Sequence, residues 1–447
     1  MDNEKTIELF PRGVVTPPPS KSLSHRALIC ASLAAFADAK KDPVAAARRR
    51  IKNLGDSDDI TATADGLGQI LHEATLTSVK AGLPKVIDCR ESGSTLRFLI
   101  PVSAALTDRE IHFTGSGRLM ERPMGAYKDI FQRRGLLFEQ NTAGLRIQGE
   151  LKPGVYELPG DVSSQFVSGL LFALPLLGGD SEIVLTTPLE SADYVRMTLD
   201  VMADFGVEAA ANEDGSGWKV TGKQHYKAAK YRVETDWSQA AFFLGAAALG
   251  RSVYTDGLNP DSIQGDRRIM NVLTDMGAYV DGEMRAFPRR NTCTMTALPP
   301  PGGLRAVTID VSGIPDLVPP VAAIACYAAG TTRLVNAGRL RIKESDRLKA
   351  LVTELSKIGA NIKEEDDALI IVGQTQLAGG SCISWNDHRI AMALALAAIG
   401  CKDPVRLTGW ESVKKSYPNF WTDFEKEAID GAEARQQRNI FGMEKNA

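Results

Sequence analysis

Three clusters of basic residues precede segments with amphipathic helical periodicity, and residues of this type could bind anions. The clusters begin at Arg118 (RLMERP), Arg341 (RIKESDR) and Lys414 (KKSYP). The N-terminus of a helix carries partial positive charge, so a cation is locally unfavourable there unless it has an anionic partner. We therefore predict that these clusters bind anions. A solvated charged surface is the alternative, since acidic residues are mixed into two of them.

Six short polar clusters precede apolar, Ala-rich segments, which are predicted to be buried helices. The clusters begin at Lys21, Glu91, Ser163, Asp236, Ile314 and Asn386. Four basic residues lie in or beside them, namely Lys21, Arg26, Arg97 and Arg389. Free N–H groups at helix starts suit anions, but Ser and Asp are also ordinary N-caps. A single Ser therefore identifies nothing, whereas the whole set favours an anion-binding surface.

These clusters are evenly spaced. One reference position in each (22, 92, 164, 238, 316 and 388) gives separations of 70, 72, 74, 78 and 72 residues. A second series of amphipathic segments lies between them, each ending at a Gly and often followed by a hairpin-like pattern. Each repeat of about 74 residues is therefore predicted to be strand, helix, strand, helix, strand, strand, an α+β unit.

The sixth repeat is predicted to be shorter than the others, because it stops after its second predicted helix at 417–428. The strand predicted at 5–10 (KTIELF) could supply a missing strand, which would place both ends of the chain in one domain. Alternatively, this strand simply begins the first repeat. The polar tail at 430–447 is predicted to be a frayed extension.

Composition limits the possible functions. The chain has 447 residues, 44% hydrophobic and 24% charged, with a formal net charge of −3. These are ordinary values for a globular protein, and they argue against nucleic-acid binding by bulk positive charge. No apolar run reaches the ~18–20 residues of a membrane span, and the first residues lack the apolar core of a signal peptide. We therefore expect a cytoplasmic protein with no membrane partner.

Other motifs carry little signal. The six Cys and five His residues are scattered without metal-ligand spacing, so neither a metal site nor a disulfide framework is predicted. The segment 217–223 matches G-x-x-x-x-G-K but lacks the following Ser or Thr and lies in a predicted hairpin, which argues against a phosphate-binding loop. The run Arg48–Arg50 is predicted to be a solvated basic patch.

At this point the motifs resemble those of the 5-enolpyruvylshikimate-3-phosphate synthase family, in order from about residue 14 to 425. They are PPPSKSLSHRAL (17–28), ESGSTLRF (91–98), GSGRLMERPMG (115–125), DVSSQFVSGLLFALPL (161–176), ESADYVRMTLDVMADFGV (190–207), VETDWSQAAFFL (233–244), SGIPDLVPPVAAIA (312–325), RIKESDRL (341–348), WNDHRIAMALA (385–395) and KKSYPNFW (414–421).

The resemblance implies an α+β fold, the two-domain inside-out α/β barrel of enolpyruvyl transferases, with three βαβαββ units per domain. One domain would span 20–232, and the other 1–19 with 233–447, closed by the N-terminal strand. The resemblance also implies transfer of enolpyruvyl from phosphoenolpyruvate to the 5-hydroxyl of shikimate 3-phosphate, with release of phosphate. No metal, organic cofactor or macromolecular partner is implied, and a monomer is expected.

The resemblance also assigns binding residues. Those for shikimate 3-phosphate are Lys21, Ser22, Arg26, Ser163, Ser164, Gln165, Ser191, Asp316 and Lys343. Those for phosphoenolpyruvate are Lys21, Gly93, Arg118, Gln165, Arg347, Arg389 and Lys415. Both substrates carry a phosphate and a carboxylate, so several Lys and Arg side chains must converge on them. Gly93 has no Cβ, which allows backbone to approach a ligand closely.

Addition and elimination need an acid and a base held close together among cations. The resemblance assigns Asp316 as the base toward the 5-hydroxyl and Glu344 as the proton donor to the methylene, with Lys343 and Lys21 as further catalytic residues. The structural alternative is that Asp316 caps the helix after Pro315 and that Glu344 pairs with a neighbouring Arg.

The sequence departs from the family pattern at three places. Glu91 stands where many relatives have Asn, the segment 36–50 has no Gly turn, and Arg339 replaces an Asn that contacts substrate in some relatives. Two other functions stay open. One is an enolpyruvyl transferase acting on a UDP-linked amino sugar, which would be expected to carry a reactive Cys that is absent between Cys89 and Cys293. The other is a non-catalytic anion-binding protein on the same repeats.

Overall fold

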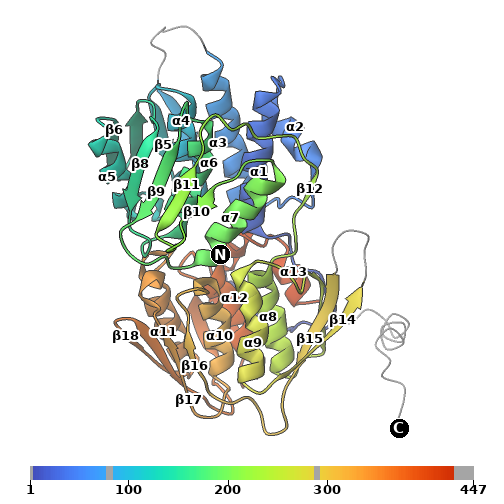
Figure 1. Ribbon diagram of the computed structural model, residues 1–447. Helices are drawn as coiled ribbons and strands as arrows, with labels where there is room; N and C mark the ends of the chain where they lie inside the picture. Colours follow the sequence, from blue (N-terminus) through green and yellow to red (C-terminus); the bar gives the residue numbers. More distant parts are fainter. Residues whose placement is uncertain (1–3, 77–83, 286–291, 427–447) are drawn as a thin grey trace. The chain divides into compact units, whose positions relative to one another are not determined.

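A computed structural model describes residues 4–76, 84–285 and 292–426. The chain forms two compact units (Figure 1). The N-terminal unit is Pro19–Val233, and the C-terminal unit combines Met1–Pro18 with Glu234–Ala447. Each unit has its own hydrophobic core. Among the described residues, each also holds three separate, open sheets, so the fold is α+β.

Three repeats follow the predicted βαβαββ order, with the first two strands parallel and the last two forming a hairpin. The second repeat contains β4 (Lys85–Asp88), α4 (Gly93–Leu106), β5 (Ile111–Thr114), the 3₁₀ helix η1 (Leu119–Glu121), α5 (Gly125–Arg133), β6 (Leu137–Asn141) and β7 (Gly144–Gln148). The third contains β8 (Gly154–Leu158), α6 (Ser164–Ala173), η2 (Leu174–Leu176), β9 (Ser181–Leu185), α7 (Ala192–Asp204), β10 (Ala210–Ala211) and β11 (Gly217–Val220). The fifth contains β16 (Thr308–Asp310), η4 (Pro315–Leu317), α10 (Val318–Ala325), β17 (Thr331–Val335), η5 (Gly338–Ile342), α11 (Arg347–Lys357), β18 (Asn361–Glu365) and β19 (Ala368–Val372).

The fourth and sixth repeats each take a strand from the N-terminus of the chain. The fourth contains α8 (Trp237–Ala248), β13 (Val253–Leu258), η3 (Gly265–Arg268), α9 (Ile269–Asp275), β14 (Tyr279–Arg285) and β15 (Thr292–Leu298), and its first strand is β2 (Gly13–Val15), parallel to β13. The sixth contains β20 (Gly380–Ile383), α12 (His388–Ala397), η6 (Ala398–Gly400), β21 (Val405–Thr408), η7 (Trp410–Lys415) and α13 (Phe420–Phe424). The strand β1 (Glu4–Ile7) pairs antiparallel with β21 and so completes a three-stranded sheet.

The first repeat differs from the others, and the expectation of one pattern throughout is wrong for it. It contains α1 (Lys21–Ala37), an additional helix α2 (Pro43–Arg50), β3 (Ile51–Lys52) and α3 (Asp58–Ala74). Its sheet pairs β3 with β12 (Tyr231–Arg232), a strand more than 170 residues away in the chain. Within the segment 36–50, residues 43–50 form α2, because Asp42 accepts the Ala45 N–H and Pro43 occupies the first helical position. Arg48–Arg50 lie in the last turn of α2, where cations are favourable.

Apolar helices form the centre of each unit, as their composition predicts. In the C-terminal unit α8, α10 and α12 lie side by side (Figure 1), and the residues of α10 and α12 are buried throughout. In the N-terminal unit α4 packs on α6. Among the described residues, no helix is both long and apolar enough to cross a lipid bilayer.

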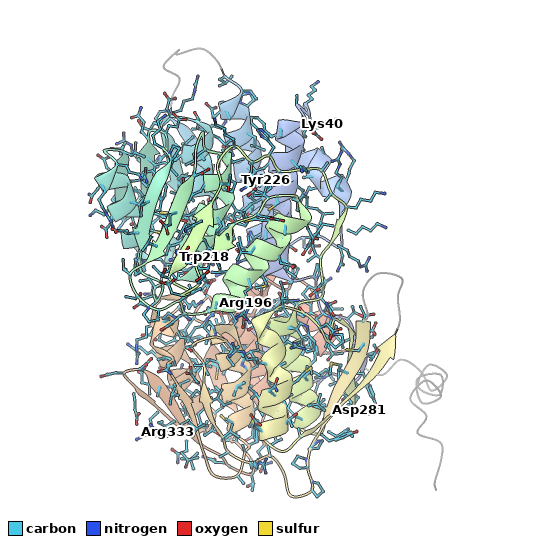
Figure 2. The ribbon with its side chains drawn as sticks, in the orientation of Figure 1. Lys40, Arg196, Trp218, Tyr226, Asp281 and Arg333 are labelled. Carbon is cyan, nitrogen blue, oxygen red and sulfur yellow. The ribbon has the colours of Figure 1, made fainter. Side chains whose placement is uncertain are left out.

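Glycines end the amphipathic helices, as the sequence pattern predicts. Gly135, Gly206, Gly277 and Gly359 follow α5, α7, α9 and α11, and each has a positive φ between 68° and 96°. Only a residue without Cβ adopts this conformation at little cost. The G-x-x-x-x-G-K segment lies in a hairpin strand, β11, on which Figure 2 labels Trp218. It is therefore not a phosphate-binding loop.

We predict that β1 contributes to the stability of the C-terminal unit. Ile7 is 1% exposed and pairs with Val405, whereas its neighbour Thr6 is exposed. Ile7→Ala should lower the free energy of unfolding by about 2–5 kcal/mol, through lost burial and a residual cavity. Thr6→Ala, the matched control, should change it by less than about 0.5 kcal/mol. Urea unfolding measures both, and equal effects would contradict this role for β1.

Candidate functional site

A buried guanidinium connects three carboxylates at one end of the C-terminal unit. Arg347, the first residue of α11, is 2% exposed at its side chain. Its Nε lies 2.9 Å from Asp387 Oδ2, its Nη1 lies 3.1 Å from Asp316 Oδ1, and its Nη2 lies 2.8 Å from Glu344 Oε2. The planar fork of Arg suits several carboxylates at once. This cluster brings together four predicted or neighbouring residues from three separate segments.

Arg389 joins the same cluster from the first turn of α12. Its Nη2 donates to Asp316 Oδ2 at 2.7 Å and to Ser238 Oγ at 3.0 Å, and its Nη1 donates to the Asp316 carbonyl at 3.1 Å. Asp316 lies in η4 between two guanidinium groups and does not cap α10, which has no side-chain capping bond. The capping alternative for Asp316 is therefore wrong. Glu344 does pair with a neighbouring Arg, as its alternative expected.

The electrostatics of the cluster keep Asp316 and Asp387 ionised. Burial alone would raise the pKa of Asp316, but Arg389, Lys343 and Arg347 outweigh burial and hold that pKa well below its usual range. Burial likewise opposes ionisation of Asp387, and Arg347 and His388 lower its pKa. The acids in turn raise the pKa of Arg347 despite its burial. Asp316, Asp387 and Arg347 are therefore fixed charges of both signs.

Lys343 is the most readily titrated cation of this set. Burial lowers its pKa to about 8, although Asp316 acts in the opposite direction.

Lys415 ends η7, and its ammonium donates to the carbonyl of Asn386. Arg339, which we left without a role, donates to the Ser312 carbonyl at 2.7 Å, close to the segment that carries Asp316.

Asp387 is central to this cluster but was not among the predicted site residues. It is the N-cap of α12, accepting Arg389 N–H at 2.9 Å, and it also accepts Ser345 Oγ at 3.0 Å. An Asp is an ordinary N-cap residue, so helix capping alone explains an acid at this position. Its pairing with Arg347 is therefore not evident from the sequence.

In the N-terminal unit, Lys21 begins α1 and its Nζ lies 2.8 Å from Asp59 Oδ2. Asp59 was missed, because an acid in the first turn of α3 is ordinary for a helix start. Ser20 caps α1 by accepting the Leu23 N–H. The salt bridge therefore keeps a cation in the unfavourable first turn of a helix.

Arg26 is buried and extensively bonded within the protein. Its Nε donates to Thr198 Oγ1 at 2.8 Å, and its other nitrogens donate to the carbonyls of Ser22 at 2.7 Å and Tyr194 at 2.8 Å. Burial lowers its pKa to about 10, which still leaves it charged at neutral pH. Arg26 thus fixes the start of α1 to α7. Ser191, directly before α7, has a left-handed backbone with φ 53°.

Gln165 links two helix starts. Its Oε1 accepts Arg97 Nη1 at 2.7 Å, and its Nε2 donates to Ser94 Oγ at 2.9 Å. Arg97 belongs to α4, and sequence analysis placed it among the basic residues at helix starts without a role. Ser163 caps α6 by accepting the Gln165 N–H, and Ser164 is the first residue of that helix. For Ser163 the capping interpretation is therefore correct.

Gly93 begins α4 directly against a guanidinium. A Cβ at this position would lie 2.9 Å from Arg122 Cζ and closer still to its Nη1. Arg122 is 8% exposed and was not predicted as a site residue. A Cβ added at Gly117, in the turn before Arg118, would lie 2.6 Å from Glu91 Oε2. Arg118 itself is half-exposed, with Glu121 Oε2 at 3.5 Å from its Nε.

The predicted residues thus form separate groups. Asp316, Lys343, Glu344, Arg347 and Arg389 converge, with Lys415 at the adjoining turn, whereas the N-terminal unit carries the Lys21, Arg26, Gln165 and Gly93 groups. Within the described residues, no group of three or more His, Cys, Asp or Glu side chains is arranged to hold a metal ion. What the C-terminal group offers chemically is paired cations with the carboxylates of Asp316, Glu344 and Asp387 beside them.

Comparison with solved structures defines the fold class. An EPSP synthase from Acinetobacter baumannii has a TM-score of 0.70 at 22% identity, covering 94% of this chain and 97% of that one. The enolpyruvyl transferase NikO from Streptomyces tendae has a TM-score of 0.67 at 17% identity, covering 94% and 96%. The chain has the fold of an enolpyruvyl transferase.

Comparison with sequences defines the family. The family model for EPSP synthase (3-phosphoshikimate 1-carboxyvinyltransferase) matches residues 11–424. A 3-phosphoshikimate 1-carboxyvinyltransferase from Clostridium kluyveri is 46% identical over 426 residues, covering 92% of this chain and 94% of the relative. One from Clostridium acetobutylicum is 44% identical over 430 residues, covering 93% and 95%. The chain belongs to the EPSP synthase family, which confirms the resemblance of its motifs.

We predict that Arg347 is needed for stability as well as for ligands. Arg347→Met leaves three carboxylates without their shared counter-charge and should lower the free energy of unfolding by about 3–5 kcal/mol. The matched control is Arg333→Met, at a residue labelled in Figure 2 whose exposed pair with Glu365 at 3.2 Å should contribute less than about 1 kcal/mol. Urea unfolding at pH 7 compares the two, and similar losses would contradict the prediction.

Proposed function

We propose that the chain transfers the enolpyruvyl group of phosphoenolpyruvate to the 5-hydroxyl of shikimate 3-phosphate, releasing phosphate, and that the residues described above perform this reaction. It is a transferase of the shikimate pathway, which supplies aromatic amino acids. The activity is supported by the match of residues 11–424 to the family model. The observation that carries the residue assignment is the convergence of Arg347 and Arg389 on Asp316. We further propose that the enzyme acts as a cytoplasmic monomer.

Substrate binding follows from the charges. We assign the phosphoenolpyruvate phosphate and carboxylate to Lys21, Gly93, Arg118, Gln165, Arg347, Arg389 and Lys415. We assign shikimate 3-phosphate to Lys21, Ser22, Arg26, Ser163, Ser164, Gln165, Ser191, Asp316 and Lys343. Two anions repel each other, and fixed cations remove that repulsion while positioning lowers the entropic cost of their reaction.

The reaction needs balanced proton transfers. In the addition step Asp316 takes the proton of the 5-hydroxyl as its oxygen bonds to C2 of phosphoenolpyruvate, and Glu344 donates a proton to the methylene C3. In the elimination step a proton returns from the new methyl group to Glu344, the C2–O bond to phosphate breaks, and Asp316 gives its proton to the departing phosphate. Lys343 and Lys21 stabilise the charge that develops at these centres.

A carboxylate with a strongly lowered pKa is a weak base, and ligand binding resolves this difficulty for Asp316. In the structure Arg347 and Arg389 both pair with Asp316. Bound anions compete for the same guanidinium groups and add negative charge beside the carboxylate. Both effects raise the pKa of Asp316 toward the range in which a base is effective.

Phosphate release from phosphoenolpyruvate, with and without shikimate 3-phosphate, tests the function. We expect release only when both are present, and Asp316→Asn should lower kcat by about 10²- to 10⁴-fold. Asp366→Asn, an exposed carboxylate of the same repeat, should leave kcat unchanged. Release that needs no shikimate 3-phosphate, release that needs a UDP-linked amino sugar instead, or no release at all would overturn the proposal.

Lys343 should make shikimate 3-phosphate affinity fall at alkaline pH. The charged ammonium binds the anion, and the bound anion raises the pKa of Lys343 above its free value of about 8. Affinity should therefore be constant below about pH 8 and fall above it, by up to about tenfold per pH unit. In Lys343→Arg the guanidinium stays charged, so affinity should change little up to pH 9.5. Titration calorimetry measures both, and equal slopes would contradict the assignment.

A further inference from the structure

Glu354 is a buried carboxylate that the reaction does not use. It lies on α11, seven residues after Arg347, and its side chain is 0% exposed. Its Oε1 accepts the indole Nε1–H of Trp385 at 2.7 Å, and its Oε2 accepts the backbone N–H of Ile383 at 3.0 Å. Lys357 also donates to both oxygens, at 2.9 and 2.8 Å. The carboxylate therefore connects α11 to the chain leaving β20.

The segment that Glu354 holds has an unusual backbone. Trp385 and Asn386 are consecutive residues with φ of 55° and 53°. Asn adopts this left-handed conformation fairly readily, but it is unfavourable for a bulky residue such as Trp385, which keeps it only where surrounding contacts enforce it. Ser384 supplies contacts on one side, donating to the Gly409 carbonyl at 2.8 Å. Glu354 supplies contacts on the other side, through the Trp385 side chain.

This left-handed turn leads directly to the cations assigned to phosphoenolpyruvate. Asn386 presents its carbonyl to Lys415. Asp387, the next residue, caps α12, binds Arg347 and fixes the first turn that carries Arg389. A displacement of the turn would therefore move Arg389 and Lys415 together and would disturb the partner of Arg347.

Pairing with Lys357 does not by itself account for the burial of Glu354. The Lys357 side chain is 43% exposed, so its ammonium remains accessible to water, whereas the carboxylate is fully enclosed. Burying a carboxylate is unfavourable unless its oxygens are well bonded. The remaining donors come from Ile383 and Trp385, at the entrance and the first position of the turn.

We propose that Glu354 is a positioning residue that holds the left-handed turn at Trp385–Asn386 and thereby orients Arg389 and Lys415 for phosphoenolpyruvate. The part of this inference that concerns phosphoenolpyruvate rests on the proposed function. The part that concerns the turn is independent of that function, because the turn can be observed without substrate.

The test compares Glu354→Gln with Lys357→Met. In Glu354→Gln an amide group replaces one oxygen, so it cannot accept from both Trp385 and Ile383. We expect the KM for phosphoenolpyruvate to rise about tenfold while the KM for shikimate 3-phosphate changes less than twofold. Lys357→Met removes the ion pair but leaves both turn contacts, so its KM values should match those of the unaltered chain. Trp385→Phe should reproduce the Glu354→Gln effect, and the double variant should be no worse than either.

Hydrogen–deuterium exchange of the ligand-free proteins supplies a readout independent of activity. Peptides covering 383–389 should exchange faster in Glu354→Gln and not in Lys357→Met. An active Glu354→Gln enzyme with an unchanged KM for phosphoenolpyruvate would overturn the proposal, as would equal rises in both KM values with exchange increased throughout the unit. Absence of activity in the unaltered chain would overturn the proposed function instead, and the exchange comparison would then decide whether Glu354 holds the turn.

Discussion

The interaction on which the C-terminal unit depends is the guanidinium of Arg347 between the carboxylates of Asp316, Glu344 and Asp387. It joins η4, the start of α11 and the N-cap of α12, and so ties the fifth repeat to the sixth. The three acids would repel one another if the cation were absent, and the cation would be too costly to bury without them. The cluster therefore exists as a whole or not at all.

This arrangement explains how a chain with a net charge of −3 can bind two anions. Basic residues of the proposed site have acidic partners within the protein, as in Lys21 with Asp59 and Arg118 with Glu121. The acids neutralise cations that helix starts would otherwise disfavour. An incoming phosphate or carboxylate must then compete with them, so some affinity is lost. What is gained is a set of cations already held in place, which reduces the ordering needed on binding.

Local patterns in the sequence were sufficient to predict the repeats, the buried helices and the glycines that end the amphipathic helices. Each depends on residues close together in the chain. The site partners could not be predicted in this way. Asp387 and Asp59 occupy helix starts where an acid is ordinary, and their second role depends on residues 40 and 38 positions away. The first repeat also escaped prediction, since its sheet pairs β3 with β12.

The repeats have similar frames but different chemistry, and the difference lies at the helix starts. The second helix of a repeat is preceded by Arg118 in the second, Ser191 in the third, and Lys343 in the fifth. These residues lie seven, one and four positions before that helix; one is half-exposed, one has a left-handed backbone and one is partly buried among charges. The frame fixes where each helix begins, whereas partners distant in the chain, such as Asp387 for Arg347, hold the side chains at that helix start. Substitutions in those partners should therefore separate binding of the two substrates more cleanly than substitutions in the frame, because the frame supports both.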